Sequence, residues 1–254
     1  MDCFCPEGVF SPVMDQPYVL EETAAYAVVY KPPRWHSAPL ERDGGEAAPP
    51  TLLRWYAARN PAVLGLRGRK AHEGGLLHRL DYETEGLVLF AKTQGALDAL
   101  ARQQREGLFV KEYAAFSRGS QEALPGFPPF FAPGPPPFTL QSAFRAFGEG
   151  RRAVRPVVPP DDGKAPKKSA LDQGEPYKTE VLEMSRRDGL VYFRLRLSRG
   201  FRHQLRCHLA WLGYAILNDK TYGGCFFNGG TLALRAQKIF FYDPESNTPR
   251  NYSI

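Results

Sequence analysis

The chain has 254 residues, of which 43% are apolar and 24% charged, with a formal net charge of +6 and a pI of about 9.1. This composition excludes a disordered chain, and the length allows one large domain or two small ones with a sizeable core. The basic balance favours a polyanionic partner, and the lack of an apolar run of about 18 residues argues against a membrane span.

The four cysteines, Cys3, Cys5, Cys207 and Cys225, are spaced for neither a disulfide framework nor a zinc ribbon. We expect reduced thiols, as in the cytoplasm, with Cys207 acting as a small buried apolar residue on a helix. Residues 1–6 lack a basic region followed by an apolar segment, so no secretory signal is predicted.

In the first part of the chain, the pattern of apolar and turn residues predicts an arm, a strand, a loop and a helix. Prolines interrupt residues 1–23, which predicts an irregular arm, and residues 26–30 form a predicted strand ended by Lys31-Pro32-Pro33. A Gly/Ala/Pro loop at 40–50 precedes a short helix at 51–58, where apolar residues recur at helical spacing. The basic loop that follows contains Arg67, Arg69 and Lys70.

After a predicted strand at 86–91, Thr93 caps a helix that Gly107 ends. The remaining predicted elements are strands at 110–116, 190–198 and 231–242, a helix at 202–212 ended by Gly213, and a polar tail at 243–254. The 190–198 segment alternates apolar and polar residues, as a half-buried antiparallel strand does.

Residues 119–176 contain clustered prolines and glycines and stand apart from the rest. Such a segment cannot build its own core, so we expect a long excursion between two strands. One interpretation is a mobile surface loop, and the alternative is a basic, aromatic lip that touches RNA phosphate. That lip would consist of Phe144, Arg145, Phe147, Arg151 and Arg152.

Asp81 stands between a partly basic segment at 77–80 and an almost uninterrupted apolar run at 86–91. Apolar surroundings shift the pKa of a carboxylate and exclude water, which suits an enzyme's nucleophile or base. A cap on a turn is the alternative role for Asp81, and its spacing alone does not decide between the two.

Several motifs along the chain favour the catalytic role. They are Val28–Pro32, His78–Asp81 followed by Gly86–Thr93, Lys111–Tyr113, Gly200–Leu209 and Leu217–Gly223. These motifs resemble those of RluA-type RNA pseudouridine synthases. The first four are similar, in order, to that family's opening strand with its Lys-Pro pair, its catalytic His-Arg-Leu-Asp motif, its Lys-x-Tyr strand and its His-Gln-Ile-Arg-Val-His-Leu helix. The Leu217–Gly223 segment follows at the family's usual place. The resemblance extends over residues 24–242, which makes chance similarity a poor explanation.

The resemblance implies the α+β pseudouridine synthase fold, in which a mixed, mostly antiparallel sheet has flanking helices and a central RNA-binding cleft. We expect one catalytic domain at 24–254, with no separate N-terminal RNA-binding domain before it. The implied reaction breaks the C1′–N1 bond of a uridine and joins C1′ to C5. It exchanges no atoms with solvent, so we expect no metal and no cofactor. The expected partner is structured RNA, either rRNA or tRNA, and the protein is expected to be a monomer without a membrane association.

The resemblance also implies roles for individual residues. Asp81 is the implied nucleophile or base, Arg206 the guanidinium that pairs with it, and Tyr113 the ring that stacks on the target base. Whether Asp81 attacks the uracil ring, attacks C1′ or removes a sugar proton stays open. Leu232 and Leu234 are the implied apolar wall of the uracil pocket, although ordinary core packing explains them equally well.

A uridine buried in folded RNA must be flipped out, and the resemblance implies that Arg79 fills the vacated space. Further RNA contacts are assigned to His78, Arg202, Lys31, Arg67, Arg69 and Lys70. Two positions depart from the family pattern. Phe201 takes the place of the usual arginine, which moves to position 202, and Arg235 replaces a histidine and is expected to add a phosphate contact.

Two other functions fit part of the sequence. One is an RNA-binding chaperone on the same scaffold, and the other is a nucleoside or glycoside hydrolase that uses Asp81 with Glu83 or Glu85. His72, His78 and Asp81 lie within ten residues and could suggest a metal site, but they do not provide three ligands at regular spacing on one element. The synthase reading accounts for more of the motifs, but the sequence does not name the target uridine.

Overall fold

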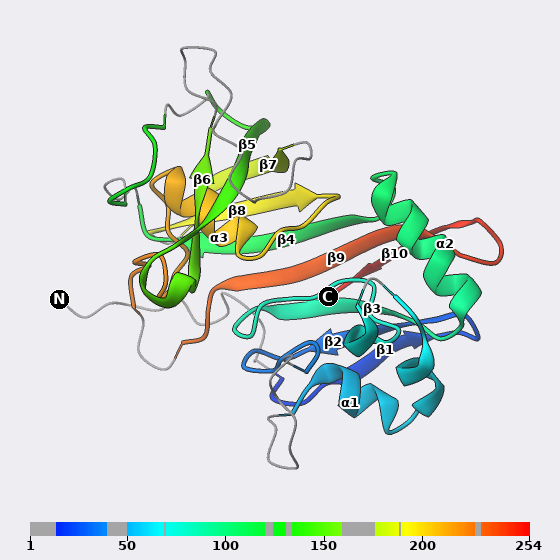
Figure 1. Cartoon of the computed structure of the whole chain (residues 1–254). Coiled ribbons are helices and arrows are strands. Elements are labelled where there is room, and N and C mark those ends of the chain that lie inside the picture. The colour runs from blue at the N-terminus through cyan, green and yellow to red at the C-terminus, as the bar shows by residue number, and fades with distance from the viewer. Residues whose placement is uncertain are drawn as a thin grey trace. The chain divides into compact units, whose positions relative to one another are not determined.

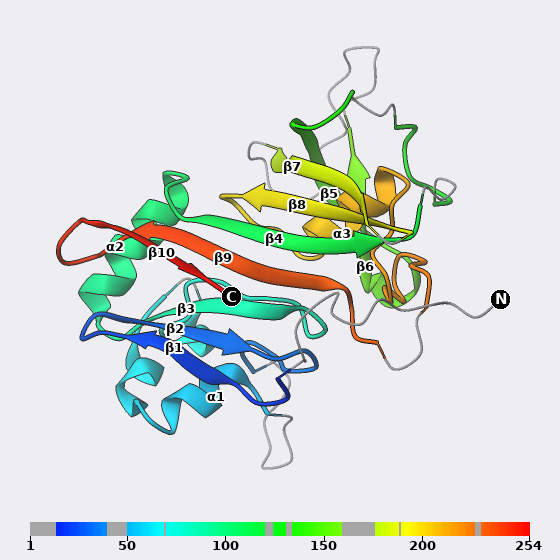
Figure 2. The ribbon, with the colours of Figure 1, turned by 180° about the vertical axis from the view of Figure 1, so that it is seen from behind.

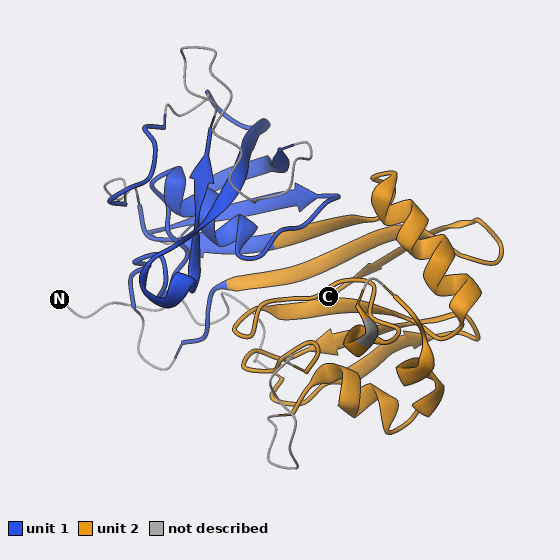
Figure 3. Cartoon of the chain, viewed as in Figure 1, with its two compact units in different colours: residues 1–6, 114–233 blue, residues 7–113, 234–254 orange. Residues whose placement is uncertain are grey.

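The computed structural model describes residues 14–39, 50–68, 70–119, 124–130, 134–158, 176–187, 189–226 and 230–254. The chain divides into two compact units (Figure 3). Unit 1 comprises residues 1–6 and 114–233, and unit 2 comprises residues 7–113 and 234–254. Strand β4, Val110–Ser117, begins in unit 2 and ends in unit 1.

Unit 2 is built on a mixed sheet (Figure 1). Its other strands are β1 (Tyr18–Glu22), β2 (Tyr26–Lys31), β3 (Glu85–Ala91), β9 (Leu234–Tyr242) and β10 (Pro249–Ser253). They are ordered β1-β2-β3-β9-β4, and β10 also pairs with β9. The β3–β9 pair is parallel, whereas β1–β2, β2–β3 and β9–β10 are antiparallel. Figure 2 shows these strands from behind.

Two α-helices of unit 2 begin at threonine caps. Helix α1 (Leu52–Ala57) follows Thr51, and helix α2 (Gln94–Arg105) follows Thr93; each threonine hydroxyl accepts a hydrogen bond from a backbone N–H three residues on. Short 3₁₀ helices lie at Pro61–Gly65 (η1) and Ala71–Glu73 (η2). Helix α2 packs on β3 and β9, and its apolar face joins a core that includes Leu87, Leu89 and Phe241.

Unit 1 is an antiparallel sheet with one α-helix. Its elements are β5 (Phe138–Phe147), η3 (Glu149–Arg151), β6 (Ala153–Val157), β7 (Tyr177–Arg187), β8 (Leu190–Leu197) and α3 (Gln204–Trp211). The strand order from β4 is β4-β8-β7-β5-β6. Helix α3 packs against β6 and β7, and all eight of its residues are buried.

The α+β class is confirmed, as are the helices predicted near 51–58, after Thr93 and near 202–212. Four regions contain strands that the sequence patterns did not predict. The supposed excursion contains β5 and β6, β7 follows it directly, the arm ends in β1, and the polar tail contains β10. In β5, buried Leu140, Ser142 and Phe144 alternate with more exposed residues, but flanking prolines and glycines obscured that period. Edge strands such as β1 and β10 are half exposed and therefore carry a weak apolar signal.

Cys207 is buried on α3 as predicted, and Cys225 is a second free thiol, whereas Cys3 and Cys5 lie outside the described residues. Among the described helices, none is both long and apolar enough to cross a membrane. The assignment of residues 24–254 to one catalytic domain stays a prediction.

Candidate active site

Asp81 lies in the loop immediately before β3, a strand whose seven residues are all buried. The Asp81 carbonyl accepts a hydrogen bond from the Thr84 N–H at 3.1 Å, which closes a tight turn just before the strand begins at Glu85. The side chain is half-buried. The structure therefore places a carboxylate at the entrance to a buried strand, as the sequence predicts.

Both chain neighbours of Asp81 are held by the last residue of β2 and the loop that follows this strand. The Ser37 hydroxyl donates to the Leu80 carbonyl and accepts from the Leu80 N–H, each at 3.0 Å, and Ser37 is only 4% exposed. On the other side, the Lys31 ammonium donates to the Tyr82 carbonyl at 3.3 Å. Sequence reasoning missed Ser37, since a single serine in a loop carries no pattern.

Lys31 does not lie at a surface that RNA can reach. It is 0% exposed, and its ammonium also donates to the carbonyls of Pro32 and Trp35, each at 2.9 Å. Burial lowers the pKa of Lys31 to about 7, although the charges of Asp81 and Glu85 act in the opposite direction. The assignment of Lys31 to an RNA contact is therefore corrected: its side chain ties the loop around Asp81 together.

Tyr113 on β4 shares the neighbourhood of Asp81. It is 7% exposed, and burial raises the pKa of its phenol, with a further increase from the Asp81 carboxylate. Its phenol is thus protonated at neutral pH and carries an O–H that can donate a hydrogen bond. The sequence motifs predicted that Tyr113 and Asp81 share one site, and both residues belong to unit 2.

His78 is also internal. Its Nε2 accepts a hydrogen bond from the Leu89 N–H at 3.3 Å, which assigns the ring proton to Nδ1. That buried nitrogen has no hydrogen-bond partner among the residues that the structure describes. Burial, and then the nearby Lys111 charge, lower the pKa of His78 to about 3. At this pKa the imidazole is neutral and offers no cation to a phosphate, and its assignment to an RNA contact stays a prediction. Lys111 is itself buried, and its Nζ lies over the ring of Phe109, 4.4 Å from the ring centroid. Burial lowers the pKa of Lys111 to about 7.

Arg79 does reach solvent. Its side chain is 50% exposed, and its Nη1 lies 3.1 Å from Oε1 of Glu73. Arg67 and Lys70 are exposed on the preceding segment, and Arg69 lies outside the described residues. Within the described ranges, no group of three His, Cys, Asp or Glu side chains is arranged to hold a metal ion, so the His72 alternative receives no support.

Arg235 and Glu85 form an internal ion pair across the parallel strands β3 and β9. The two residues are register partners, and Arg235 Nε lies 2.9 Å from Glu85 Oε1. The other Glu85 oxygen accepts the hydroxyl of Tyr30, and Glu85 is 1% exposed. The expected phosphate contact of Arg235 is therefore corrected, because its guanidinium is 12% exposed and held by Glu85. Glu85 is likewise occupied, which removes it as the second carboxylate of a hydrolase.

Arg206 on α3 is 3% exposed and makes a bidentate pair with Asp219. The distances are 2.7 Å from Nε to Oδ2 and 2.8 Å from Nη2 to Oδ1, and Nη2 also donates to Thr221 at 3.0 Å. Asp219 and Thr221 lie within the Leu217–Gly223 motif, and neither residue was assigned a role from the sequence. Arg206 belongs to unit 1 and Asp81 to unit 2, so their pairing stays a prediction.

The departure at positions 201 and 202 has a structural explanation in unit 1. Phe201 stacks on Phe144, with ring centroids 5.1 Å apart and planes 9° apart, and completes an aromatic cluster with Tyr177. Arg202 is exposed, and its Nη2 donates to the carbonyls of Arg151 at 3.0 Å and Ala153 at 3.1 Å. The phenylalanine therefore supports the core, while the displaced arginine holds the start of β6.

Leu232 and Leu234 are each 3% exposed. Leu232 belongs to unit 1 and Leu234 begins β9 in unit 2. Their burial agrees with core packing, and their role as the wall of a uracil pocket stays a prediction.

Comparison with known proteins places these residues in a family. Residues 25–211 match the RNA pseudouridylate synthase family. A relative from Chlorobaculum parvum, described as an uncharacterized RNA pseudouridine synthase, is 28% identical over 84% of this chain and 66% of its own length. The large-subunit pseudouridine synthase D of Pasteurella multocida is 30% identical over 71% of this chain and 46% of its own. The dual-specificity RNA pseudouridine synthase RluA of Vibrio vulnificus is 28% identical over 70% of this chain and 64% of its own length.

These alignments span from about half to two thirds of the relatives' lengths. Among solved structures, human RNA pseudouridylate synthase domain containing 1 has the same fold, with a TM-score of 0.59 and 21% identity over 99% of this chain and 86% of that one. The family match covers well over half of the chain and includes the Asp81 loop, Tyr113 and Arg206. The chain belongs to the RluA-type RNA pseudouridylate synthase family.

Proposed function

We propose that this protein is an RNA pseudouridine synthase in which Asp81 is the catalytic carboxylate. The observation that carries the proposal is the construction of the Asp81 loop: a carboxylate at the entrance to a buried strand, with both neighbouring residues held by hydrogen bonds to their backbone. A turn cap alone does not require such support. A reacting carboxylate does, since small displacements of a catalytic group lower its rate substantially.

The reaction is an isomerisation. The C1′–N1 bond of the uridine breaks, the uracil rotates, C1′ bonds to C5, and the proton lost from C5 balances the proton gained at N1. Asp81 supplies the nucleophile or base. Tyr113, protonated because burial and Asp81 raise its pKa, stacks on the base and donates a hydrogen bond rather than accepting the C5 proton.

The target uridine must leave the RNA stack, and Arg79 is the side chain proposed to fill the space. Its ion pair with Glu73 is half exposed, and such pairs contribute only about 0–1 kcal/mol, so Arg79 can leave it at little cost. The names of the relatives point to ribosomal RNA and, in one case, dual specificity, and we propose structured rRNA or tRNA as the substrate. A monomeric, cytoplasmic enzyme remains our expectation.

The decisive test incubates the protein and its Asp81→Asn variant with unmodified transcripts of large-subunit rRNA and tRNA, and then maps pseudouridine at nucleotide resolution. We expect pseudouridine at defined positions with the natural protein and none with the variant, which folds because it keeps the Thr84 turn through the backbone. RNA binding without pseudouridine would support a chaperone instead. Release of free uracil would support a hydrolase.

A further inference from the structure

Five arginines of unit 1 gather on the β5–β6 hairpin and in the segment that leads into α3. This arginine cluster consists of Arg145, Arg151, Arg152, Arg155 and Arg202. Arg145 on β5 and Arg155 on β6 are direct register partners, so two positive charges face each other across the hairpin. Like charges in this arrangement destabilise a sheet, and their presence indicates a function other than stability.

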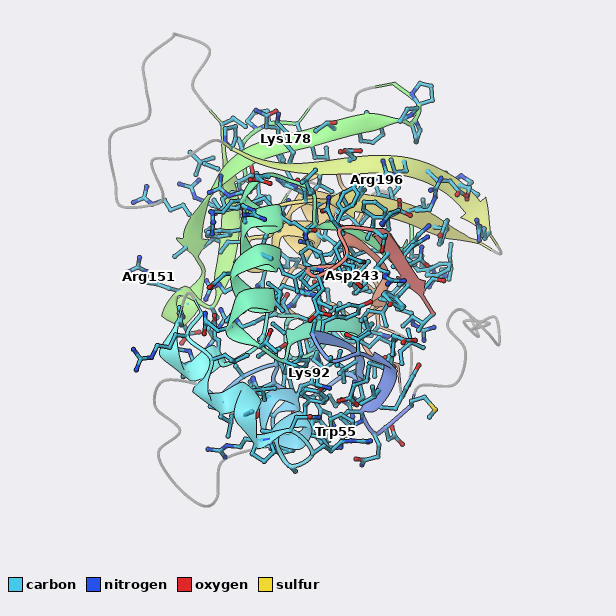
Figure 4. The ribbon with its side chains drawn as sticks, turned by 90° about the vertical axis from the view of Figure 1, so that its right-hand side faces the viewer. Trp55, Lys92, Arg151, Lys178, Arg196 and Asp243 are labelled. Carbon is cyan, nitrogen blue, oxygen red and sulfur yellow. The ribbon has the colours of Figure 1, made fainter. Side chains whose placement is uncertain are left out.

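The cluster lacks carboxylate partners within the described parts of the chain. Arg202 and Arg155 donate to backbone carbonyls instead, Arg155 to Gly126 at 2.6 Å. Glu149 lies in the hairpin turn but forms no ion pair there in the portion of unit 1 that the structure describes. The neighbouring β7–β8 pair differs, since Arg187, for example, lies 2.9 Å from Glu183. Arg151 projects from the outer end of the hairpin (Figure 4).

A groove of about 240 Å³ lies beside Arg155. Its walls include Phe127, Pro128, Pro156 and Val157, so it is largely apolar with a cation at one side. The wall that carries Phe127 is fixed in place, because Arg155 binds the Gly126 carbonyl and the Trp211 indole donates to the Pro128 carbonyl at 3.0 Å. The groove is therefore formed before any ligand arrives.

We propose that the arginine cluster and this groove bind a single-stranded segment of the RNA substrate, with phosphates on the arginines and one unpaired base in the groove. Flat aromatic and proline surfaces stack with bases of any sequence, and arginines without carboxylate partners complement the phosphate charge. A base within a duplex is already stacked on its neighbours, so the groove selects single strands. The inference rests on the proposed function, because it concerns how that substrate is held outside the Asp81 site.

The test uses a fluorescein-labelled oligoadenosine, which contains no target uridine, and measures its affinity by anisotropy across a range of salt concentrations. Each lost phosphate contact reduces the salt slope by about 0.7 for single strands, so the Arg145→Gln/Arg152→Gln variant is expected to reduce it by about 1.4. Neither side chain makes a hydrogen bond or ion pair in the described structure, so the variant folds. Arg186→Gln is the matched control, an exposed arginine on β7 of the same unit, and leaves the slope unchanged.

A second variant tests the groove. Phe127→Leu is expected to weaken oligoadenosine binding by roughly 5- to 150-fold without changing the salt slope, because it removes stacking but no charge. Thermal denaturation of the variant checks its packing on Phe147 and Tyr222.

Several outcomes would overturn the proposal. They are an unchanged slope in the arginine variant, equal loss with Arg186→Gln, equally tight binding of a duplex, or tighter binding of polyglutamate than of RNA. Pseudouridine mapping with the same proteins separates this proposal from the proposed function. If the arginine variant lowers the salt slope but no pseudouridine forms, the RNA-binding surface is supported and the proposed function is not. If pseudouridine forms but the salt slope is unchanged, only the proposed function is supported.

Discussion

The Ser37→Ala substitution tests whether the support of the Asp81 loop is needed for catalysis. It removes two hydrogen bonds of 3.0 Å and leaves the N–H and the carbonyl of Leu80 without their partner in a buried setting, where Leu80 is 7% exposed. Each lost bond costs about 0.5–1.5 kcal/mol, so the loop loses roughly 1–3 kcal/mol of anchoring. Asp81 is the next residue, and a displacement of about 1 Å lowers a rate by roughly 100-fold.

The assay is single-turnover pseudouridine formation on a structured transcript, with RNA affinity and urea denaturation measured in parallel. We expect a rate reduced by about 10- to 100-fold with little change in RNA affinity, because Ser37 acts on the catalytic group rather than on binding. Ser117→Ala is the matched control: it removes a buried 2.8 Å hydrogen bond to the Ala215 carbonyl in unit 1 and should lower stability alone. A folded Ser37→Ala protein with the natural rate would refute the reasoning.

Three further predictions follow from the ion pairs and the buried histidines. Arg79→Met should slow pseudouridine formation on folded RNA more than on a short unstructured oligonucleotide, because only folded RNA requires base flipping. Glu73→Gln releases Arg79 from its ion pair. It should change the free energy of unfolding by less than about 1 kcal/mol and leave the rate of pseudouridine formation at least as high. Asp219→Asn leaves the buried Arg206 charge without its carboxylate, and urea denaturation should show a loss of about 3–5 kcal/mol. Asp243→Asn should cost less, because the arginine it leaves behind, Arg250, is 42% exposed and remains solvated. Burial lowers the pKa of both His78 and His208 to about 3, so each contributes stability that is complete above the unfolded pKa of 6.5 and is lost as the pH falls towards 3. From about pH 7.5 to about pH 5.5, each histidine should lower the free energy of unfolding by about 1.4 kcal/mol. His208→Gln should remove about half of the combined pH dependence, and a pH-independent free energy of unfolding would contradict the assignment.

The elements that sequence patterns predicted well are those with complete local signals. Helix α2 has a threonine cap, an apolar stripe and a glycine stop, and all three depend on neighbouring residues. The edge strands β1 and β10 and the β5–β6 hairpin were missed because half-exposed strands and flanking prolines and glycines weaken the apolar period, even though each strand pairs with a neighbour in the sequence. Proline content alone suggested a loop where Phe144 and Val154 are in fact core residues.

At the candidate site, the motif located Asp81 and Tyr113, but it could not indicate which charged residues face inward. Lys31, His78 and Arg235 were all predicted to be cations that contact RNA. Lys31 is buried, His78 and Arg235 are half-buried, and each is hydrogen-bonded within its own unit. Burial depends on the tertiary structure, and a lysine that donates to three carbonyls has no sequence signature distinct from a surface lysine. Ser37, Asp219 and Thr221 were missed for the complementary reason, because common polar residues acquire a role only through their partners.

These internal pairs change what the net charge of +6 means for RNA binding. Arg206 is neutralised by Asp219 and Arg235 by Glu85, and Lys31 is 0% exposed, so these three cations contribute little at the surface. Exposed positive charge remains elsewhere, for example in unit 2 at Arg67, Lys70 and Arg79, and in unit 1 at most of the arginine cluster. A phosphate backbone is attracted to charge that remains solvated, so the salt dependence of RNA binding should reflect the exposed cations and not the total charge.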